Sequence, residues 1–251
     1  MRIDYLLLLA ETASDAAHGE EHVLAPEATK IFSLAGIPVT NTVLSAWLVM
    51  AVLLLVAWAV TRNLKAVPSG AQNVVEAIIE AWIGVIEQVA GKRGRMFVPL
   101  VVTAFLFILG NNWIGLLPIF GNVTWFRSAN SDLNLTAAMA IVVFISVQVW
   151  GIKSMGVGGY LKEFVVPNPL HIITELSRPL SLSLRLFGNV FAGEVLLETM
   201  VRLAPPVLFI FLGLEMFVGV VQALIFAMLT LAFLSIATAH GHGAEAEEQH
   251  H

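Results

Sequence analysis

Three uncharged apolar runs, each long enough to cross a lipid bilayer, restrict this chain to a membrane fold. They extend from Thr42 to Val60, from Met96 to Pro118 and from Leu133 to Gly151, and a helix of about 20 residues spans the ~30 Å hydrocarbon core. Hydrophobic residues make up 58% of the chain and charged residues 12%, with a mean hydropathy of +0.84. Soluble domains carry about twice that share of charge. The sequence therefore predicts an all-α integral membrane protein.

Two later apolar runs are longer and are interrupted by charged residues. They extend from Leu170 to Val201 and from Val207 to His240, and each would measure roughly 48–51 Å as one continuous helix. Helices of this length must either tilt steeply or break, and Pro179, Gly213 and Gly219 are the candidate break points. A proline pair separates the two runs, so we expect them to form a hairpin.

The segment between the first two spans predicts a helix of another kind. From Gln72 to Val89, acidic residues recur at helical spacing on one stripe, and large apolar residues occupy the rest of the helix surface. Such a pattern is typical of an amphipathic helix at the membrane surface or against a partner. A sixth span is the alternative, but three acids in the segment disfavour it. The expected fold is therefore five spanning helices plus one interfacial helix.

The distribution of basic residues predicts the orientation in the membrane. The stretch between the first and second spans carries five Lys or Arg residues, and the loop between the third span and the two long runs carries two. The loop between the second and third spans carries only one. The positive-inside rule then places the N-terminus outside and the C-terminus in the cytoplasm. We expect an external segment at 1–40, a membrane domain at 41–240 and a cytoplasmic tail at 241–251. The polar composition of both ends predicts solvated tails, and the histidines of the last one are not expected to hold a metal.

Composition also excludes several classes of function. The chain has no cysteine, which rules out disulfides, thiol catalysis and cysteine-ligated metals. No basic patch with interleaved aromatic residues indicates nucleic-acid binding, because the basic residues follow the predicted loops. We expect no cofactor, no metal and no nucleic-acid partner.

Arg185 lies near the middle of the first long run, where a charge without a task is costly. Insertion scales put a central arginine at about +2.5 to +3.5 kcal/mol, and its guanidinium cannot escape by losing a proton. A carboxylate or an aqueous cavity must meet it, so we interpret Arg185 as a functional residue. Arg178 lies nearer the predicted cytoplasmic side, where its long side chain could simply reach the interface.

Further polar residues follow the two long runs. Asn189 shares a helix face with Arg185, whereas Glu194 lies on roughly the opposite side and nearer the outer end. In the second run, Glu215 and Gln222 are seven residues apart and share a face. Two isolated carboxylates in facing apolar helices favour a proton relay, although each could also be a structural group paired with polar backbone.

His171 and Glu175 stand toward the opposite end of the first long run from Glu194. They are four residues apart and therefore share a helix face, where they could exchange a hydrogen bond. With Arg185 at mid-depth between the two groups, the pattern indicates two offset polar access routes and not one open pore.

These residues carry a family resemblance. The stretch from Glu175 to Glu194, ELSRPLSLSLRLFGNVFAGE, followed by Glu215 and Gln222 and preceded by the segment NNWIGLLP at 111–118, resembles subunit a of the rotary F-type ATP synthase membrane sector. The likeness covers nearly all of the spanning region. It implies that Arg185 is the essential stator arginine. It also implies that Asn189 and Gln222 are its polar neighbours and that Glu194 and Glu215 belong to the proton route.

Two positions depart from the commonest family pattern. Glu215 stands where some bacterial members have histidine, and the acid is similar to the mitochondrial and related types. His171 stands where many members carry an acid on the cytoplasmic route. The second departure leaves open whether His171 or Glu175 serves that route.

The resemblance implies a function and a set of partners. The chain would be a stator subunit of the bacterial inner membrane, without a hydrolytic site of its own. It would form two offset half-channels against a rotating ring of c subunits and contact peripheral-stalk b-type subunits within the whole ATP synthase complex and the lipid bilayer. A secondary proton-coupled transporter is the alternative, because Arg, Glu and broken helices also build such sites, but no internal repeat supports it. An intramembrane hydrolase lacks a nucleophile motif here, and a scaffold would leave Arg185 unexplained.

Overall fold

The five expected apolar runs are helices in the computed structural model, which describes residues 30–34, 37–62, 64, 65, 70–116, 127–165 and 170–248. All five are long and apolar enough to cross a membrane, so the predicted all-α membrane class is confirmed. They are α2 (Asn41–Thr61), α4 (Val98–Leu116), α6 (Leu133–Val165), α7 (Leu170–Leu203) and α8 (Leu208–Glu248).

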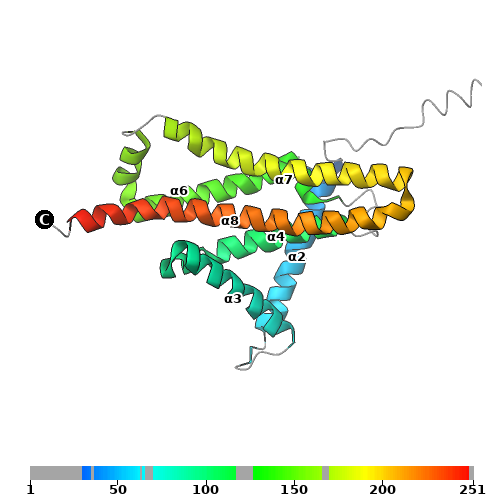
Figure 1. Ribbon diagram of the computed structural model, residues 1–251, viewed down its shortest axis with the longest axis horizontal. Helices are drawn as coiled ribbons and strands as arrows, with labels where there is room; N and C mark the ends of the chain where they lie inside the picture. The colour runs from blue at the N-terminus through cyan, green and yellow to red at the C-terminus, as the bar shows by residue number, and fades with distance from the viewer. Residues whose placement is uncertain are drawn as a thin grey trace, which may run out of the picture.

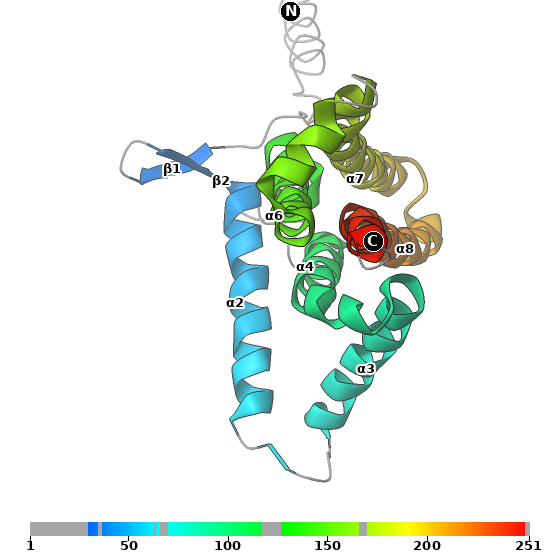
Figure 2. The ribbon, with the colours of Figure 1, turned by 90° about the vertical axis from the view of Figure 1, so that its left-hand side faces the viewer.

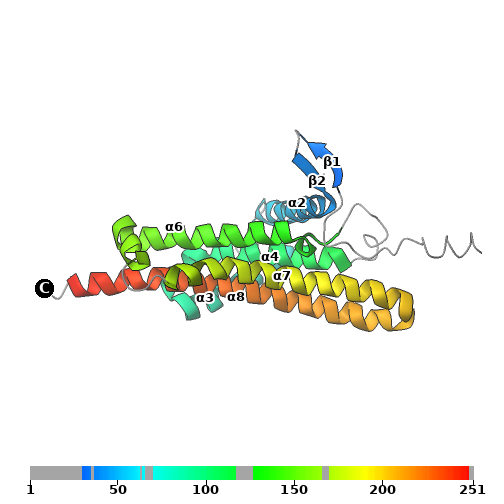
Figure 3. The same ribbon diagram turned by 90° about the horizontal axis from the view of Figure 1, so that it is seen from above.

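Four of these helices lie alongside one another. Figures 1 and 3 show α4, α6, α7 and α8 running roughly parallel to the long axis of the molecule, with α8 packed against the other three. The core between them contains fully buried apolar side chains from different helices, among them Ile108, Leu186 and Phe226. Within each apolar run the buried residues recur at helical spacing, so one face of each helix is turned inward.

Helix α2 differs in direction from the other four. Figure 2 views the four long helices nearly end-on and shows α2 running across them, at their side. Only its first half contains buried residues, whereas Leu54, Leu55 and Trp58 farther along are exposed. Apolar side chains that no part of the described chain covers are those expected to face lipid. If α2 stands upright as a single span of about 31 Å, the other four helices are strongly inclined.

The amphipathic segment forms α3 (Ala71–Ala90), which leads through the 3₁₀ helix η1 (Lys92–Phe97) into α4. Its apolar side buries Trp82 and Ile86, and the Trp82 ring lies 5.1 Å from that of Phe105 in α4. Of the described helices, α3 is the long one that lacks the hydropathy of a span. The prediction of one interfacial helix in addition to five spans thus agrees with the structure.

The two long runs are continuous helices. Pro179 lies inside α7 and both glycines named as break points lie inside α8 without ending it. A kink occurs instead in α6, where Gly156 has a φ of +72°, a conformation that glycine adopts without steric cost. Helix α6 continues beyond Gly151, where the sequence predicted the end of the span, and α8 continues beyond His240.

A short 3₁₀ turn, η3 (Pro205–Val207), connects α7 to α8, and a second, η2 (Ala129–Ser131), precedes α6. The structure also contains an element that the sequence analysis did not anticipate. Strands β1 (Lys30–Leu34) and β2 (Ile37–Thr40) pair antiparallel just before α2. Two strands of four or five residues leave too short a pattern to recognise.

Candidate functional site

Arg185 projects from the outward face of α7. Its neighbours Leu182 and Leu186 are buried in the bundle, whereas Leu184 and Arg185 are exposed. The structure gives Arg185 no hydrogen bond or ion pair with any residue it describes. A guanidinium at the centre of an apolar helix requires a counter-charge, and this chain supplies none there from its described part.

Asn189 and Gln222 lie together one turn from Arg185. The Asn189 Nδ2 donates a hydrogen bond of 2.7 Å to Gln222 Oε1. Gln222 is buried between the helices, and Asn189 reaches the exposed face. The amide pair therefore joins α7 to α8 directly beside the arginine.

Glu194 faces the other way, into the protein, and pairs with an arginine from outside the two long helices. Arg127 Nε donates to Glu194 Oε2 at 2.9 Å, and the two side chains are only 11% and 17% exposed. The Arg127 guanidinium also lies 5.7 Å from the centre of the Phe191 ring. The sequence analysis did not assign Arg127, although its position as the only basic residue in its loop was the available signal.

Glu215 reaches the same place from α8 because Gly193 leaves room for it. A Cβ atom built on Gly193 would overlap the Glu215 carboxylate. Gly193 directly precedes Glu194 in the chain, so the Glu215 carboxylate lies over the residue next to Glu194. Glu194, Glu215 and Arg127, which we call the outer acidic site, therefore come from three separate segments of the chain.

A group of amides holds the elements behind this site. Asn130 Nδ2 donates to Asn112 Oδ1 at 2.8 Å, and Asn112 Nδ2 donates to the Gly219 carbonyl at 2.9 Å. These bonds link η2, α4 and α8 in a buried position. Thr42 at the start of α2 donates to the Asp132 carboxylate at 2.8 Å, which fixes α2 to the same region.

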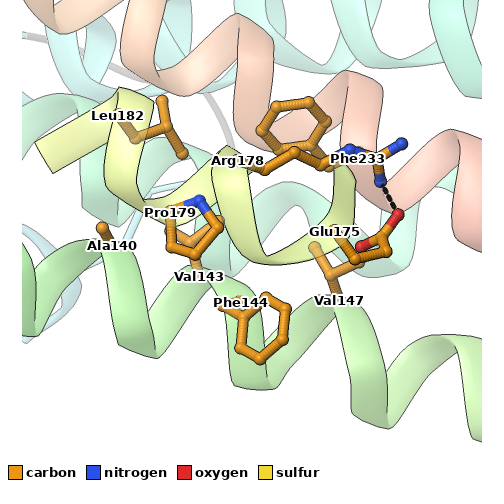
Figure 4. A pocket seen from close by; sticks show the side chains of 9 residues that line it. All are labelled: Ala140, Val143, Phe144, Val147, Glu175, Arg178, Pro179, Leu182 and Phe233. Carbon is orange, nitrogen blue, oxygen red and sulfur yellow. Dashed lines mark ion pairs between the residues drawn. The ribbon is translucent and has the colours of Figure 1, made fainter. Parts of the chain in front are cut away.

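At the other end of α7, Glu175 forms an ion pair with Arg178. Figure 4 shows this pair with the guanidinium against the Phe233 ring of α8, at 5.0 Å from the ring centre. Glu175 is 6% exposed. Arg178 thus has a partner inside the bundle. The alternative from the sequence, in which its long side chain extends to the membrane interface, does not describe this structure. We call this pair the inner acidic site. The side chain of His171 lies outside the part of the chain that the structure describes.

Arg185 lies between the two acidic sites along α7. Ten residues separate it from Glu175 and nine from Glu194, which correspond to roughly 15 and 14 Å of helix. Neither carboxylate can reach the guanidinium across that distance. Among the described residues, no three potential ligands gather as a metal site would require.

Comparison with known proteins gives one consistent family. Residues 43–235 match the family model of the ATP synthase A chain. ATP synthase subunit a of Moorella thermoacetica is 38% identical over 224 residues, which cover 85% of this chain and 97% of that protein. The Bradyrhizobium ATP synthase subunit a 2 is 37% identical, covering 83% and 93%. That of Geobacter sulfurreducens is 40% identical, covering 77% and 86%. This multi-pass membrane protein therefore belongs to the ATP synthase subunit a family.

Proposed function

We propose that the chain is the stator subunit of the proton-translocating ATP synthase membrane sector, and that it couples proton flow to rotation of a ring of c subunits. The observation that carries the proposal is Arg185, which is exposed on an apolar helix without a counter-charge from the described chain. An ionised carboxylate on another subunit would supply the counter-charge that Arg185 needs.

The surface around Arg185 suits an approaching helix. Leu180 and Leu184 are exposed beside it, and Gly188 and Ala192 add two small exposed positions along the same face. Small residues allow close approach of helices within a membrane. We assign this face of α7 to the ring.

Arg185 acts as a fixed charge because a guanidinium keeps its proton in a protein. It attracts a ring carboxylate only while that carboxylate is ionised. A carboxylate that moves on into lipid must first be protonated, since a charge there is costly and a neutral acid is tolerated. The arginine also repels a proton that would pass directly from one side to the other, so the proton must travel with the ring.

The outer acidic site supplies the first of two half-channels. Glu215 is the proton donor to the ring carboxylate, and Glu194 hands protons to Glu215 from the outside. Arg127 positions the Glu194 carboxylate, and Gly193 positions that of Glu215. Asn189 and Gln222 extend the polar path from the site toward Arg185.

The inner end of α7 supplies the second half-channel, where the ring carboxylate releases its proton. We assign the transfer to His171, because an imidazole can both accept and donate a proton, whereas the Glu175 carboxylate is paired with Arg178 of its own helix. Each charge that crosses is worth about 2.3 kcal/mol per 100 mV, so several protons must be coupled to one ATP.

The proposal extends to the surroundings of the chain. We place it in the bacterial inner membrane with segment 1–40 outside, domain 41–240 in the membrane and tail 241–251 in the cytoplasm, in contact with peripheral-stalk b-type subunits. The chain has no cysteine, so single cysteines test this without background. Gly159→Cys should react from the cytoplasmic side and Leu203→Cys from outside; reaction of both from one side would overturn the orientation.

Cross-linking tests the contact with the ring. Ala192→Cys on the exposed face should form a disulfide with a cysteine placed beside the ring carboxylate, whereas Ala140→Cys, at a buried position of α6, should not. If Ala192→Cys gave no cross-link in an active complex, the ring would lie elsewhere. Proton transport by the purified chain alone would instead favour the secondary transporter.

A further inference from the structure

A basic cavity lies apart from both acidic sites, where one candidate span begins and another ends. It has a volume of about 660 Å³ and is lined by η1, α6 and α8, with the last residues of α3 beside it. Three cationic side chains line it: Lys92, Arg93 and Lys153. Among the described residues that line it there is no carboxylate. In a chain with a net charge of −5, this is a local concentration of positive charge.

The cavity lies at the level where lipid headgroups are expected. Lys92 begins one candidate span and Ala239 ends another, and both line the cavity. The amphipathic helix α3, whose pattern is typical of an interfacial position, ends at the cavity wall. Phosphate groups of a bilayer lie at this boundary between apolar span and water.

An aromatic ring holds one of the cations in place. The Lys153 Nζ lies 4.9 Å from the centre of the Trp150 ring, and the Phe97 ring packs edge-on against the same tryptophan at 5.6 Å. Tryptophan is enriched at the interface because one part of its ring system is apolar and its N–H is polar. The arrangement gives the cavity an apolar wall beside a fixed charge.

The hydroxyl groups of the cavity are already in use as donors. Ser154 Oγ donates to the Gly151 carbonyl at 3.0 Å, and Thr238 Oγ1 donates to the Leu234 carbonyl at 2.8 Å. Recognition therefore depends on the cations, which favours an anion over a neutral sugar or alcohol. A volume of about 660 Å³ falls in the range of small-molecule sites, 300–1,000 Å³.

We propose that this basic cavity binds the headgroup of an anionic phospholipid, with Lys92 and Lys153 beside the phosphate and the Trp150 and Phe97 side facing the acyl chains. Basic hollows between spanning helices bind such headgroups because the lipid surface presents the anion at the matching depth. The site is separate from the proton route and does not depend on it. Lipid bound here would fix η1 and the end of α3 against α6 and α8.

Native mass spectrometry of the full chain in detergent tests the binding. We expect one phosphatidylglycerol to be retained more tightly than phosphatidylcholine with the same acyl chains, by about fivefold for each cation involved. Lys92→Gln with Lys153→Gln should abolish this preference. Arg62→Gln with Lys65→Gln, which removes the same charge from exposed positions after α2, should retain it. Equal loss in both double variants would reduce the effect to general attraction and overturn the site. Displacement of the lipid by millimolar inorganic phosphate would also overturn lipid recognition.

A thiol at the cavity locates the bound lipid in vesicles. With Ser154→Cys as the sole cysteine of this chain, phosphatidylglycerol should slow reaction with a small maleimide several-fold relative to phosphatidylcholine, and Gly159→Cys on the same helix should react equally in both. The assay is then repeated in the intact complex. Equal rates for Ser154→Cys in the two lipids would overturn the proposal. Protection in the complex that is independent of lipid would overturn it too, because a protein subunit would then cover the cavity.

Discussion

Two arginines of this chain, Arg127 and Arg185, meet opposite surroundings. Arg127 is largely buried, pairs with Glu194 and lies over an aromatic ring. Arg185 is exposed on the face of an apolar helix and has no such partner among the described residues. A charge that is satisfied within its own chain can only position its neighbours, whereas a charge left open in a membrane is available to another subunit. Under the proposed function, we therefore assign the first arginine to positioning the proton route and the second to the coupling step.

The strongest test of this difference is Arg185→Ala. We expect ATP-driven proton pumping in membrane vesicles to fall by at least about 100-fold, since the fixed charge acts directly on the moving carboxylate. Arg185→Lys should fail as well, because an ammonium lacks the planar fork of the guanidinium and can lose its proton. Arg62→Ala, at an exposed position after α2, is the matched control. Pumping near the parental rate in Arg185→Ala, with an assembled complex, would refute the stator assignment.

Glu215→Gln should have the next largest effect. An amide cannot transfer a proton, so we expect pumping to slow by about 10- to 100-fold. Glu215→His should be partly tolerated because imidazole also titrates. Glu80→Gln, an exposed acid of α3, should have no effect. If Glu215→Gln pumped normally, the route would not pass through the outer acidic site.

Removal of Arg127 should act through Glu194 and not on the ring. Arg127→Gln should slow pumping by roughly tenfold and lower the thermal stability of the purified chain, because it leaves a carboxylate without its partner in a largely buried place. Glu194→Gln added to it should recover stability, with a coupling free energy of about 0.5–3 kcal/mol. Additive losses in the double-mutant cycle would show that the ion pair contributes nothing.

Gly193→Ala tests whether the space over Gly193 positions Glu215. The new methyl group would overlap the carboxylate and displace it. A displacement of a reacting group by about 1 Å slows its reaction, but the flexible Glu215 side chain can partly move aside, so we expect the pumping rate to fall by about tenfold or less. Gly84→Ala in α3 has nothing within 4 Å of the added carbon and should be neutral. A neutral Gly193→Ala would mean that Glu215 takes another position in the working complex.

The inner acidic site should show the smallest effect. Because the proposed function assigns proton release to His171 and leaves Glu175 paired with Arg178, Glu175→Gln should slow pumping less than Glu215→Gln does, by under about tenfold. His171→Ala should slow pumping more than Glu175→Gln does, and His171→Glu, which keeps a group that can carry a proton, should pump near the parental rate. Measurements of pumping across a range of pH in these variants decide between the two residues. The reverse order of severity would assign the inner route to Glu175.

Much of the fold was predictable because hydrophobicity is a local property of the sequence. Uncharged runs such as 42–60 and 133–151 agree with α2 and with most of α6, and the amphipathic period places α3 to within a residue at each end. The ends of α6 and α8 were missed because both helices continue into polar or charged residues, such as Lys153 in α6, where the uncharged run ends. The kink at Gly156 depends on a backbone conformation that several other glycines of the chain could equally have adopted, and the strand pair before α2 depends on a pairing that no short sequence pattern records.

The sequence by itself singled out Arg185, because a charge in an apolar helix is costly and its position follows from composition and spacing alone. Only the tertiary structure decided the partners. Arg127 comes to Glu194 from 67 residues away, and Gly193 admits Glu215 from a second helix. Helical spacing relates residues three, four or seven apart, and it carries no information about which distant segments meet. Packing of one helix against another supplies that information, since only the assembled bundle brings these side chains within bonding distance.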